Sequence, residues 1–353
     1  MKQILGVFMS APRTPESHRL KVDEVVEETA DARSLVFAVP EDADEAFSYA
    51  PGQFLTLRVP DDRGGSVARC YSLSSSPHTD GALRVTVKRV DGGHGSNWLC
   101  DNITAGSTVE VLPPAGVFTP KSLDGNFLLF AGGSGITPIM SIVRSALARG
   151  DGRVVLVYAN RDERSVIFAD ALRDLAARHP GRLTVVHWLE AVQGLPEASA
   201  LQALAEPFAD YETFVCGPAA FMDIAAQALK AVSTNKVHVE KFLSLEQNPF
   251  EDAPEPVEAS GEDAATVEVD IDGEQHRITW PRQQRLLDLL LERGIDAPFS
   301  CRQGACSACA CRINSGEVAM QQNDILEQED LDEGIVLACQ ALPVTDEVHV
   351  SYE

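Results

Sequence analysis

The stretch FSCRQGACSACAC, residues 299–311, places Cys301, Cys306 and Cys309 on one short loop, and Cys339 follows after a gap of 29 residues. The spacing, C-x4-C-x2-C and then a distant cysteine, is that of plant-type [2Fe–2S] sites. Thiolates are soft ligands that suit iron–sulfur clusters, whereas a zinc ribbon would show two CxxC pairs. We therefore predict that these four thiols bind a [2Fe–2S] cluster in a redox protein. The alternative is a set of buried structural thiols.

The residues around this loop predict a small β-rich domain at 264–353. The segment TVEVDIDGEQHRITW, 266–280, resembles a hairpin that turns at Asp272-Gly273, a favoured two-residue turn. A helix over 283–294 is expected to end at Gly294, and EVHVSYE, 347–353, is expected to be the last strand. Strands, one crossing helix and a cluster loop predict a β-grasp ferredoxin domain.

Upstream, the hydrophobic pattern changes twice. Short runs rich in β-branched residues between 19 and 120 predict an antiparallel β-barrel. Between 121 and 243, apolar strands alternate with helical stretches, which predicts an α/β domain with a parallel sheet. Segment 244–263 is rich in Pro, Glu, Asp and Ser and is predicted to be a linker, and residues 1–18 an N-terminal extension. We expect a multidomain chain with three folded domains.

The charge of the chain is unevenly distributed. The net charge is −24, and residues 244–353 hold 24 acidic residues against six Arg and no Lys, a balance of −18 that leaves −6 for the rest. This acidity argues against a nucleic-acid partner. It is consistent with electrostatic steering of a protein partner or with simple solvation of a small acidic domain.

The composition, 44% hydrophobic and 23% charged, is that of a soluble globular protein. No apolar run reaches the roughly 18 residues of a membrane span, and the N-terminus lacks a convincing signal sequence. Eight cysteines are few for a disulfide scaffold, so a reducing cytoplasm is the expected location. We expect a monomer without a membrane partner.

Two motifs in the predicted barrel suit a flavin. In Arg69-Cys70-Tyr71-Ser72, Arg69 and Tyr71 share one face of a strand, where an arginine can meet a pyrophosphate and an aromatic ring can pack on an isoalloxazine. Gly92–Asn97 precedes Trp98-Leu99, the expected start of a helix, and free N–H groups there suit a pyrophosphate. The alternative for the first motif is an exposed cross-strand pair, and the alternative for the second is a flexible hairpin loop.

Two further motifs suit a nucleotide. The segment AGGSGITP, 131–138, follows a strand and opens a helix, although it is not GxGxxG. Cys216-Gly217-Pro218 ends a later strand at the same edge of the predicted sheet, where ligands of parallel sheets bind. Cys216 can equally be a buried small hydrophobe.

The remaining cysteines and the histidines are less informative. Cys70, Cys100 and Cys311 are predicted to be packing thiols, and Cys311 to point away from the cluster. The histidines show no spacing typical of a metal site; they are His18, His78, His94, His179, His187, His238, His276 and His349.

The order of these motifs resembles a known family. RxYS, GGxxSNxL, GGSGITP, CGP and CxxxxCxxC…C occur in this order in the ferredoxin–NAD(P) reductase superfamily, in oxygenase reductases with a fused C-terminal plant-type ferredoxin. The resemblance covers residues 19–353. Within the family the chain is most similar to reductase components of 3-ketosteroid 9α-hydroxylases, in SVARCYSLSSSP and NDILEQEDLDEG for example, and phenylacetyl-CoA epoxidase reductases are near neighbours.

The resemblance implies roles for individual residues. Arg69 would bind the FAD pyrophosphate, Tyr71 would pack against the isoalloxazine, and Ser72 would lie near its reactive edge. The FAD site would be completed by Val87, Lys88, Gly95 and Ser96. The nicotinamide nucleotide would be bound by Gly133, Ser134, Gly135, Ile136, Thr137, Pro138, Cys216, Gly217 and Pro218.

The resemblance also implies that four residues lie at or near the reacting atoms. Cys216 would sit beside the hydride carbon, and Thr137 would be close to both cofactors. HVEKF, 238–242, matches the family's HxExF, so Phe242 would cover the flavin until nicotinamide displaces it, and Glu240 would be nearby. The ferredoxin reductases of photosynthesis end at this aromatic residue, whereas this chain continues into the predicted linker.

The implied function is an electron-transfer reductase that passes electrons from NADH to FAD, then to the [2Fe–2S] cluster and on to a separate Rieske-type oxygenase. The substrate, steroid or other, would bind the oxygenase. One alternative is the same reductase serving a di-iron epoxidase or another aromatic oxygenase. A second is a ferredoxin-like carrier whose upstream domains bind a partner and no cofactor.

The segment after VVLVYAN, 154–160, bears on nucleotide choice. It reads Arg161-Asp162-Glu163-Arg164-Ser165. Arg161 and Arg164 could receive the 2′-phosphate of NADPH, but Asp162 and Glu163 stand between them and would repel it. A carboxylate here could instead accept a hydrogen bond from a ribose hydroxyl. We therefore expect a preference for NADH. The alternative is a solvated helix start with Ser165 as its N-cap.

Overall fold

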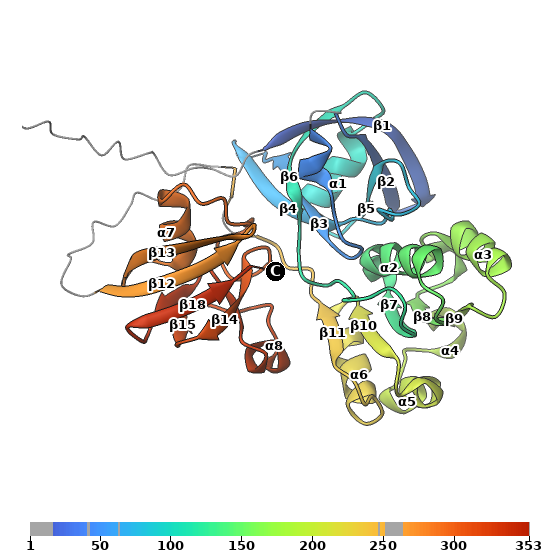
Figure 1. Cartoon of the computed structure of the whole chain (residues 1–353). Helices are drawn as coiled ribbons and strands as arrows, with labels where there is room; N and C mark the ends of the chain where they lie inside the picture. Colours follow the sequence, from blue (N-terminus) through green and yellow to red (C-terminus); the bar gives the residue numbers. More distant parts are fainter. Residues whose placement is uncertain (1–16, 41–42, 63, 246–247, 251–263, 353) are drawn as a thin grey trace, which may run out of the picture. The chain divides into compact units, whose positions relative to one another are not determined.

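The computed structural model describes residues 17–40, 43–62, 64–245, 248–250 and 264–352. They form two compact units, one over Ser17–Ser244 and a C-terminal one that begins at Leu245 (Figure 1). Each unit is considered by itself. No helix in the described ranges is long and apolar enough to cross a membrane.

An antiparallel barrel forms the first half of the N-terminal unit, as predicted. Its sheet order is β4-β3-β6-β1-β2-β5, and a bridge between Leu73 and Val85 joins the two outer strands. Inward-facing residues such as Leu20, Leu35 and Leu57 are fully buried in its core. The elements are β1 His18–Thr29, β2 Ala32–Ala38, η2 Glu45–Phe47, β3 Phe54–Pro60, β4 Ser66–Ser72, β5 Leu83–Lys88, α1 His94–Asn102 and β6 Thr108–Ala115.

A parallel five-stranded sheet, ordered β11-β10-β7-β8-β9, forms the second half, again as predicted. Its elements are β7 Phe127–Gly132, η3 Gly133–Gly135, α2 Ile136–Arg149, β8 Val154–Asn160, η4 Glu163–Ser165, α3 Ala169–Arg178, β9 Leu183–Leu189, α4 Glu190–Gln193, α5 Ala198–Ala205, η5 Glu206–Phe208, β10 Glu212–Cys216, α6 Ala219–Lys230 and β11 Val237–Glu240. The predicted strand 154–160 matches β8 residue for residue.

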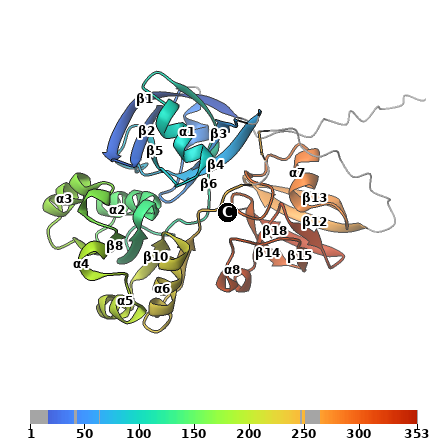
Figure 2. The same ribbon diagram turned by 180° about the vertical axis from the view of Figure 1, so that it is seen from behind.

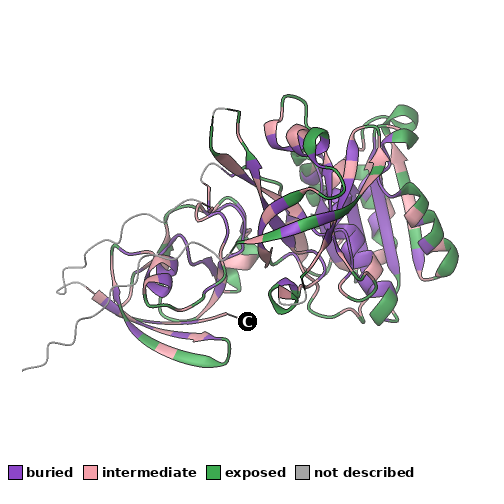
Figure 3. Ribbon diagram, turned by 90° about the horizontal axis from the view of Figure 1, so that it is seen from above, coloured by how far each residue is buried: buried purple, intermediate pink, exposed green. Residues whose placement is uncertain are grey.

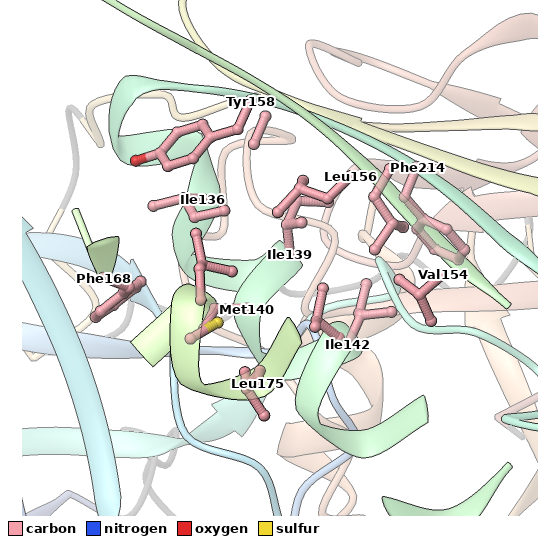
Figure 4. Packing of buried hydrophobic residues seen from close by; sticks show 14 of the residues in the cluster. Ile136, Ile139, Met140, Ile142, Val154, Leu156, Tyr158, Phe168, Leu175 and Phe214 are labelled. Atoms are coloured by element: carbon pink, nitrogen blue, oxygen red, sulfur yellow. The ribbon is translucent and has the colours of Figure 1, made fainter. Parts of the chain in front are cut away.

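Helices cover both faces of this sheet (Figures 1 and 2). Leu129 and Leu156 pack on one face against α2 and α3, in a core that Figure 4 shows around Ile136, Ile139 and Tyr158. The neighbouring residues on the strands point to the other face, where they pack against α5 and α6. Both faces are therefore apolar, and the strands lie in the buried interior (Figure 3).

The C-terminal unit has a mixed sheet ordered β13-β12-β18-β14-β16, with a separate β15-β17 pair. Its elements are β12 Ala264–Ile271, β13 Glu274–Pro281, α7 Leu286–Glu292, β14 Ala310–Ser315, β15 Val318–Met320, α8 Gln328–Asp332, β16 Ile335–Leu337, β17 Ala341–Pro343 and β18 Glu347–Ser351. The predicted hairpin is present, and Asp272 and Gly273 have the positive φ values, 51° and 77°, that a type I′ turn requires. Gly294, also at φ 77°, follows the helix as expected.

Two predicted helices, α1 and α7, begin at residues other than those expected. Helix α1 begins at His94 rather than at Trp98, because Gly93 is extended and its backbone turns the chain into the helix four residues earlier. Helix α7 begins at Leu286 rather than at residue 283, because Arg285 before it is extended. The alternative interpretation of 161–165, a helix start capped by Ser165, also differs from the structure: Asp162 is the cap of η4, and its carboxylate accepts a 2.9 Å hydrogen bond from the Ser165 N–H. The predicted linker and N-terminal extension lie mostly outside the described residues.

Buried hydroxyl groups join the two halves of the N-terminal unit. Ser141 on α2 donates to the Ser75 carbonyl at 2.6 Å, and the Ser76 and Ser145 hydroxyls are 2.8 Å apart. Beside them, one nitrogen of Arg144 lies 3.1 Å from both carboxylate oxygens of Asp80. These contacts hold α2 against the barrel segment 74–80, and so fix the start of α2 relative to strand β4.

Candidate functional site

A cavity of about 230 Å³ opens between the barrel and the start of α2. It brings together nine of the predicted site residues: Arg69, Tyr71, Ser72, Lys88, Gly95, Ser96, Ser134, Thr137 and Phe242. Three further residues that line it, Cys70, Gly93 and His94, lie inside the predicted flavin motifs, and four others were not predicted as ligand contacts: Thr86, Val90, Leu243 and Ser244. The cavity is smaller than the roughly 300–1,000 Å³ of pockets that enclose a whole ligand, so a dinucleotide would lie partly outside it.

Arg69 and the first turn of α1 form the polar end of the cavity. The Arg69 side chain packs so closely on Gly95 that a Cβ at Gly95 would lie 2.9 Å from its Cγ. Gly93, the N-cap, offers no side chain to the free N–H groups of this turn. A guanidinium beside a helix N-terminus favours a phosphate group. Because Gly95 and Arg69 fit in this way, the polar end suits the pyrophosphate of FAD.

Strand β5 contributes alternate side chains to the cavity. Thr86 and Lys88 face it, whereas Val87 lies in the barrel core with 1% of its side chain exposed. The side chain of Val87, a predicted FAD contact, therefore points away. Burial lowers the pKa of Lys88, and Asp31, whose carboxylate is 3.8 Å from the Lys88 ammonium, opposes that shift. Because side chains alternate between the two faces of a strand, the prediction of Lys88 could have been extended to Thr86, two residues earlier on β5.

The predicted nucleotide loop meets the cavity through Ser134 and Thr137. The Thr137 hydroxyl donates to the Ser134 carbonyl at 3.1 Å, which orders the turn. A Cβ on Gly135 would lie 2.2 Å from the Cys216 carbonyl oxygen, so only glycine lets η3 approach β10 this closely. Gly133, Gly135, Ile136, Pro138, Gly217 and Pro218 do not line the cavity itself.

Cys216 and Glu240 lie side by side at the ends of β10 and β11. Both side chains are buried, with 0% and 8% exposed, and neither lines the cavity. Burial raises the pKa of the Cys216 thiol well above its usual range, and the nearby Glu240 adds to this. Burial also raises the pKa of Glu240 to about 8. At neutral pH Cys216 is therefore a thiol, and most of Glu240 is protonated.

Phe242 stands at the rim of the cavity, with 46% of its side chain exposed. Leu243 beside it is 38% exposed. Large apolar side chains exposed at the mouth of a polar cavity are suited to contact a flat aromatic ligand.

The four predicted cluster ligands are all buried and lie together in the C-terminal unit. Cys301 contacts Cys306 and Cys339, and Cys339 contacts Cys309. The Cys301 sulfur also accepts hydrogen bonds from the N–H groups of Gln303 and Ala305, both at 3.4 Å. The hydrogen bond from Cys306, followed by that from Cys339, lowers the pKa of Cys301 well below its usual range. The loop therefore favours a thiolate, the form that binds iron.

The four neighbouring thiols suit the two iron ions of a [2Fe–2S] cluster. A two-iron cluster takes two protein ligands on each iron, so four neighbouring thiols with backbone donors to sulfur fit it. Cys311, two residues after Cys309, is buried in the domain core, where burial raises the pKa of its thiol.

Comparison with known proteins identifies the domains. Residues 19–119 match an oxidoreductase FAD-binding domain, 129–227 an oxidoreductase NAD-binding domain and 269–344 a 2Fe-2S iron-sulfur cluster binding domain. The ferredoxin reductase component of 3-ketosteroid-9-alpha-monooxygenase from Rhodococcus rhodochrous is 59% identical over 98% of this chain and 99% of its own. This chain belongs to that family. The resemblance seen in the sequence motifs is thereby confirmed.

Two further proteins match this chain at lower sequence identity. A component of the 1,2-phenylacetyl-CoA epoxidase from Escherichia coli is 36% identical over 95% of this chain and 98% of its own. The crystal structure of phthalate dioxygenase reductase covers 95% of this chain and 98% of its own, with a TM-score of 0.56 and 24% identity, and shares the fold. The three-domain prediction, with a barrel, a parallel sheet and a ferredoxin domain, is confirmed.

The family reductase is an oxidoreductase that uses FAD, NAD and a [2Fe–2S] cluster. When bound, FAD supplies hydride acceptance and the cluster supplies one-electron transfer. The protein's part is orientation: Arg69 and α1 suit the phosphates, and Tyr71, Ser72 and Thr137 surround the space beside them. The wall of the cavity thus combines residues from the flavin and nucleotide motifs.

The cluster ligands can be tested one cysteine at a time. We expect serine at Cys301, Cys306, Cys309 or Cys339 to abolish or strongly alter the electron paramagnetic resonance signal of the reduced protein, because serine lacks the thiolate. Cys311→Ser is the matched control and should keep the signal. If Cys311→Ser loses the cluster while any of the four other serine variants keeps it, the ligand set is wrong.

Glu240 should make the stability of β10 and β11 depend on pH. Its pKa is raised from 4.5 to about 8, so between these values the unfolded chain releases a proton that the folded chain keeps. The contribution of Glu240 to the free energy of unfolding is complete below about pH 4.5. It is lost as the pH rises through 8, a loss of roughly a few kcal/mol. Hydrogen exchange of β10 and β11 peptides in urea should show this loss. Glu240→Gln should flatten it, and the exposed Glu206→Gln should not.

Proposed function

We propose that this reductase passes electrons from NADH, through FAD and the [2Fe–2S] cluster, singly to a separate Rieske-type oxygenase that hydroxylates 3-ketosteroids at the 9α position. The observation that carries the proposal is one cavity in which Arg69 and Tyr71 of the flavin motif face Ser134 and Thr137 of the nucleotide loop. A hydride donor and acceptor must meet at van der Waals distance, and this cavity joins their two sites. The name of the Rhodococcus relative supports the steroid assignment.

Reconstitution tests this function. The purified holoprotein and a Rieske-type 3-ketosteroid oxygenase should together convert NADH, oxygen and a 3-ketosteroid to the 9α-hydroxylated product, and neither protein should do so alone. A di-iron epoxidase is the control partner, because a phenylacetyl-CoA epoxidase component is a relative. Faster electron transfer to the epoxidase than to the Rieske protein would contradict the proposal.

We further propose a monomer in a reducing cytoplasm. All eight cysteines are free, which supports a reducing compartment. The large exposed apolar side chains among the described residues are few and scattered over both units, with Phe242 and Leu243 engaged at the cavity rim. Size-exclusion chromatography with light scattering should give the mass of one chain.

The proposed preference for NADH has a structural basis in Asp31 of the barrel. Its carboxylate binds the Arg161 guanidinium at 3.0 Å, across the two halves of the N-terminal unit. Arg161, the first residue after β8, is thereby paired with a carboxylate, which weakens its attraction for a 2′-phosphate. Asp162 is occupied by Ser165, whose hydroxyl donates to it at 2.7 Å, and this leaves Glu163 as the carboxylate suited to a ribose hydroxyl.

We predict a clear preference for NADH in kcat/KM. Asp31→Asn should leave the Arg161 guanidinium free to pair with the 2′-phosphate and so raise kcat/KM for NADPH several-fold. Glu163→Gln should reduce the preference for NADH, because it removes the carboxylate suited to the ribose hydroxyl. The gain from Asp31→Asn should vanish in the Asp31→Asn, Arg161→Gln double variant, and the exposed Asp151→Asn should have no effect. Equal turnover of NADPH and NADH by the unmodified protein would contradict this charge argument.

A further inference from the structure

Gln340 follows the cluster ligand Cys339 directly and is buried, with 2% of its side chain exposed. Its amide nitrogen Nε2 donates to the Cys339 sulfur at 3.4 Å and to the Arg302 carbonyl at 3.0 Å. A side-chain amide has two N–H donors, and both are used here. Because both neighbours are acceptors, only the orientation that points the nitrogen toward them satisfies the hydrogen bonds.

The bond to the Arg302 carbonyl joins the two segments that carry the predicted ligands. Arg302 and Gly304 belong to the cysteine loop, whereas Gln340 belongs to the segment of Cys339. A Cβ at Gly304 would lie 3.2 Å from the Gln340 Cγ, so the loop and the side chain pack in contact. Gly304 has a φ of 75°, where glycine is favoured.

Arg302 shows that this junction is under constraint. It has a φ of 56°, a left-handed conformation that costs a non-glycine residue about 1–2 kcal/mol. Such conformations persist where the surroundings hold them. The Gln340 amide holds the Arg302 carbonyl, and the Arg302 guanidinium lies 4.6 Å from the centre of the Phe299 ring.

We propose that Gln340 is a positioning residue that sets the reduction potential of the cluster. A one-electron reduction adds negative charge to the cluster and its thiolates, and an N–H group aimed at a ligand sulfur stabilises that charge. The same amide ties Cys339 to the cysteine loop. The proposal rests on Cys339 being a ligand, as in the proposed function.

The test uses the full-length holoprotein and a potentiometric titration followed by electron paramagnetic resonance. Gln340→Met has a similar shape but no N–H group, and we expect the equilibrium constant for cluster reduction to fall about tenfold, equal to 59 mV for one electron. Gln322→Met, an exposed position near the same loop, is the control and should leave the potential unchanged.

The possible results distinguish a failure of the proposal for Gln340 from a failure of the cluster-ligand assignment. An unchanged potential in Gln340→Met, with full iron and sulfide content, would overturn the proposal. If that variant loses its cluster, the wild-type protein carrying ¹⁵N in its glutamine side chains decides the question: pulsed resonance should detect a nitrogen coupled to the reduced cluster, and its absence would equally overturn the proposal. A cluster that survives Cys339→Ser would instead show that the ligand assignment is at fault.

Discussion

The hydrogen-bonded contact between helix α2 and the barrel segment 74–80 is the constraint on which the flavin–nucleotide unit depends. Ser141 and Ser145 are small, so the helix can approach the barrel closely enough for direct hydroxyl contacts. The start of the same helix carries Thr137 into the cavity opposite Arg69. Because buried polar groups are costly when unpaired, this interface favours one relative placement of the two halves. The position of the cavity wall follows from that placement.

The features predicted most accurately from the sequence are those with strong local signals. Strand β8 was predicted to the residue because a run of buried β-branched and apolar side chains is bounded by polar residues. The turn at Asp272-Gly273 was predicted because few residues tolerate positive φ. The cysteine spacing identified the cluster domain, since each ligand position follows from the geometry of a known loop.

The features that were missed depend on contacts between distant residues or on competing local preferences. The pair of Asp31 and Arg161 joins residues 130 positions apart, and no pattern in either segment indicates the other. Helix α1 was expected to start too late, because two glycines near its true start lower helix propensity, whereas tertiary packing against Arg69 and the barrel favours the helix. Val87 was predicted to contact the flavin together with its neighbour Lys88, but its side chain lies in the barrel core, because adjacent residues on a strand face opposite sides.

The different burial of the cysteines has a practical consequence. All eight cysteines lie in the described residues, and seven are buried, whereas Cys70 is partly exposed in the wall of the flavin cavity. In the folded chain, an alkylating reagent would therefore meet Cys70 ahead of the seven buried cysteines. Its rate of modification would report on occupancy of that wall, since a bound flavin would shield it. The protein thus carries an intrinsic footprinting probe for cofactor loading, which requires no engineered label.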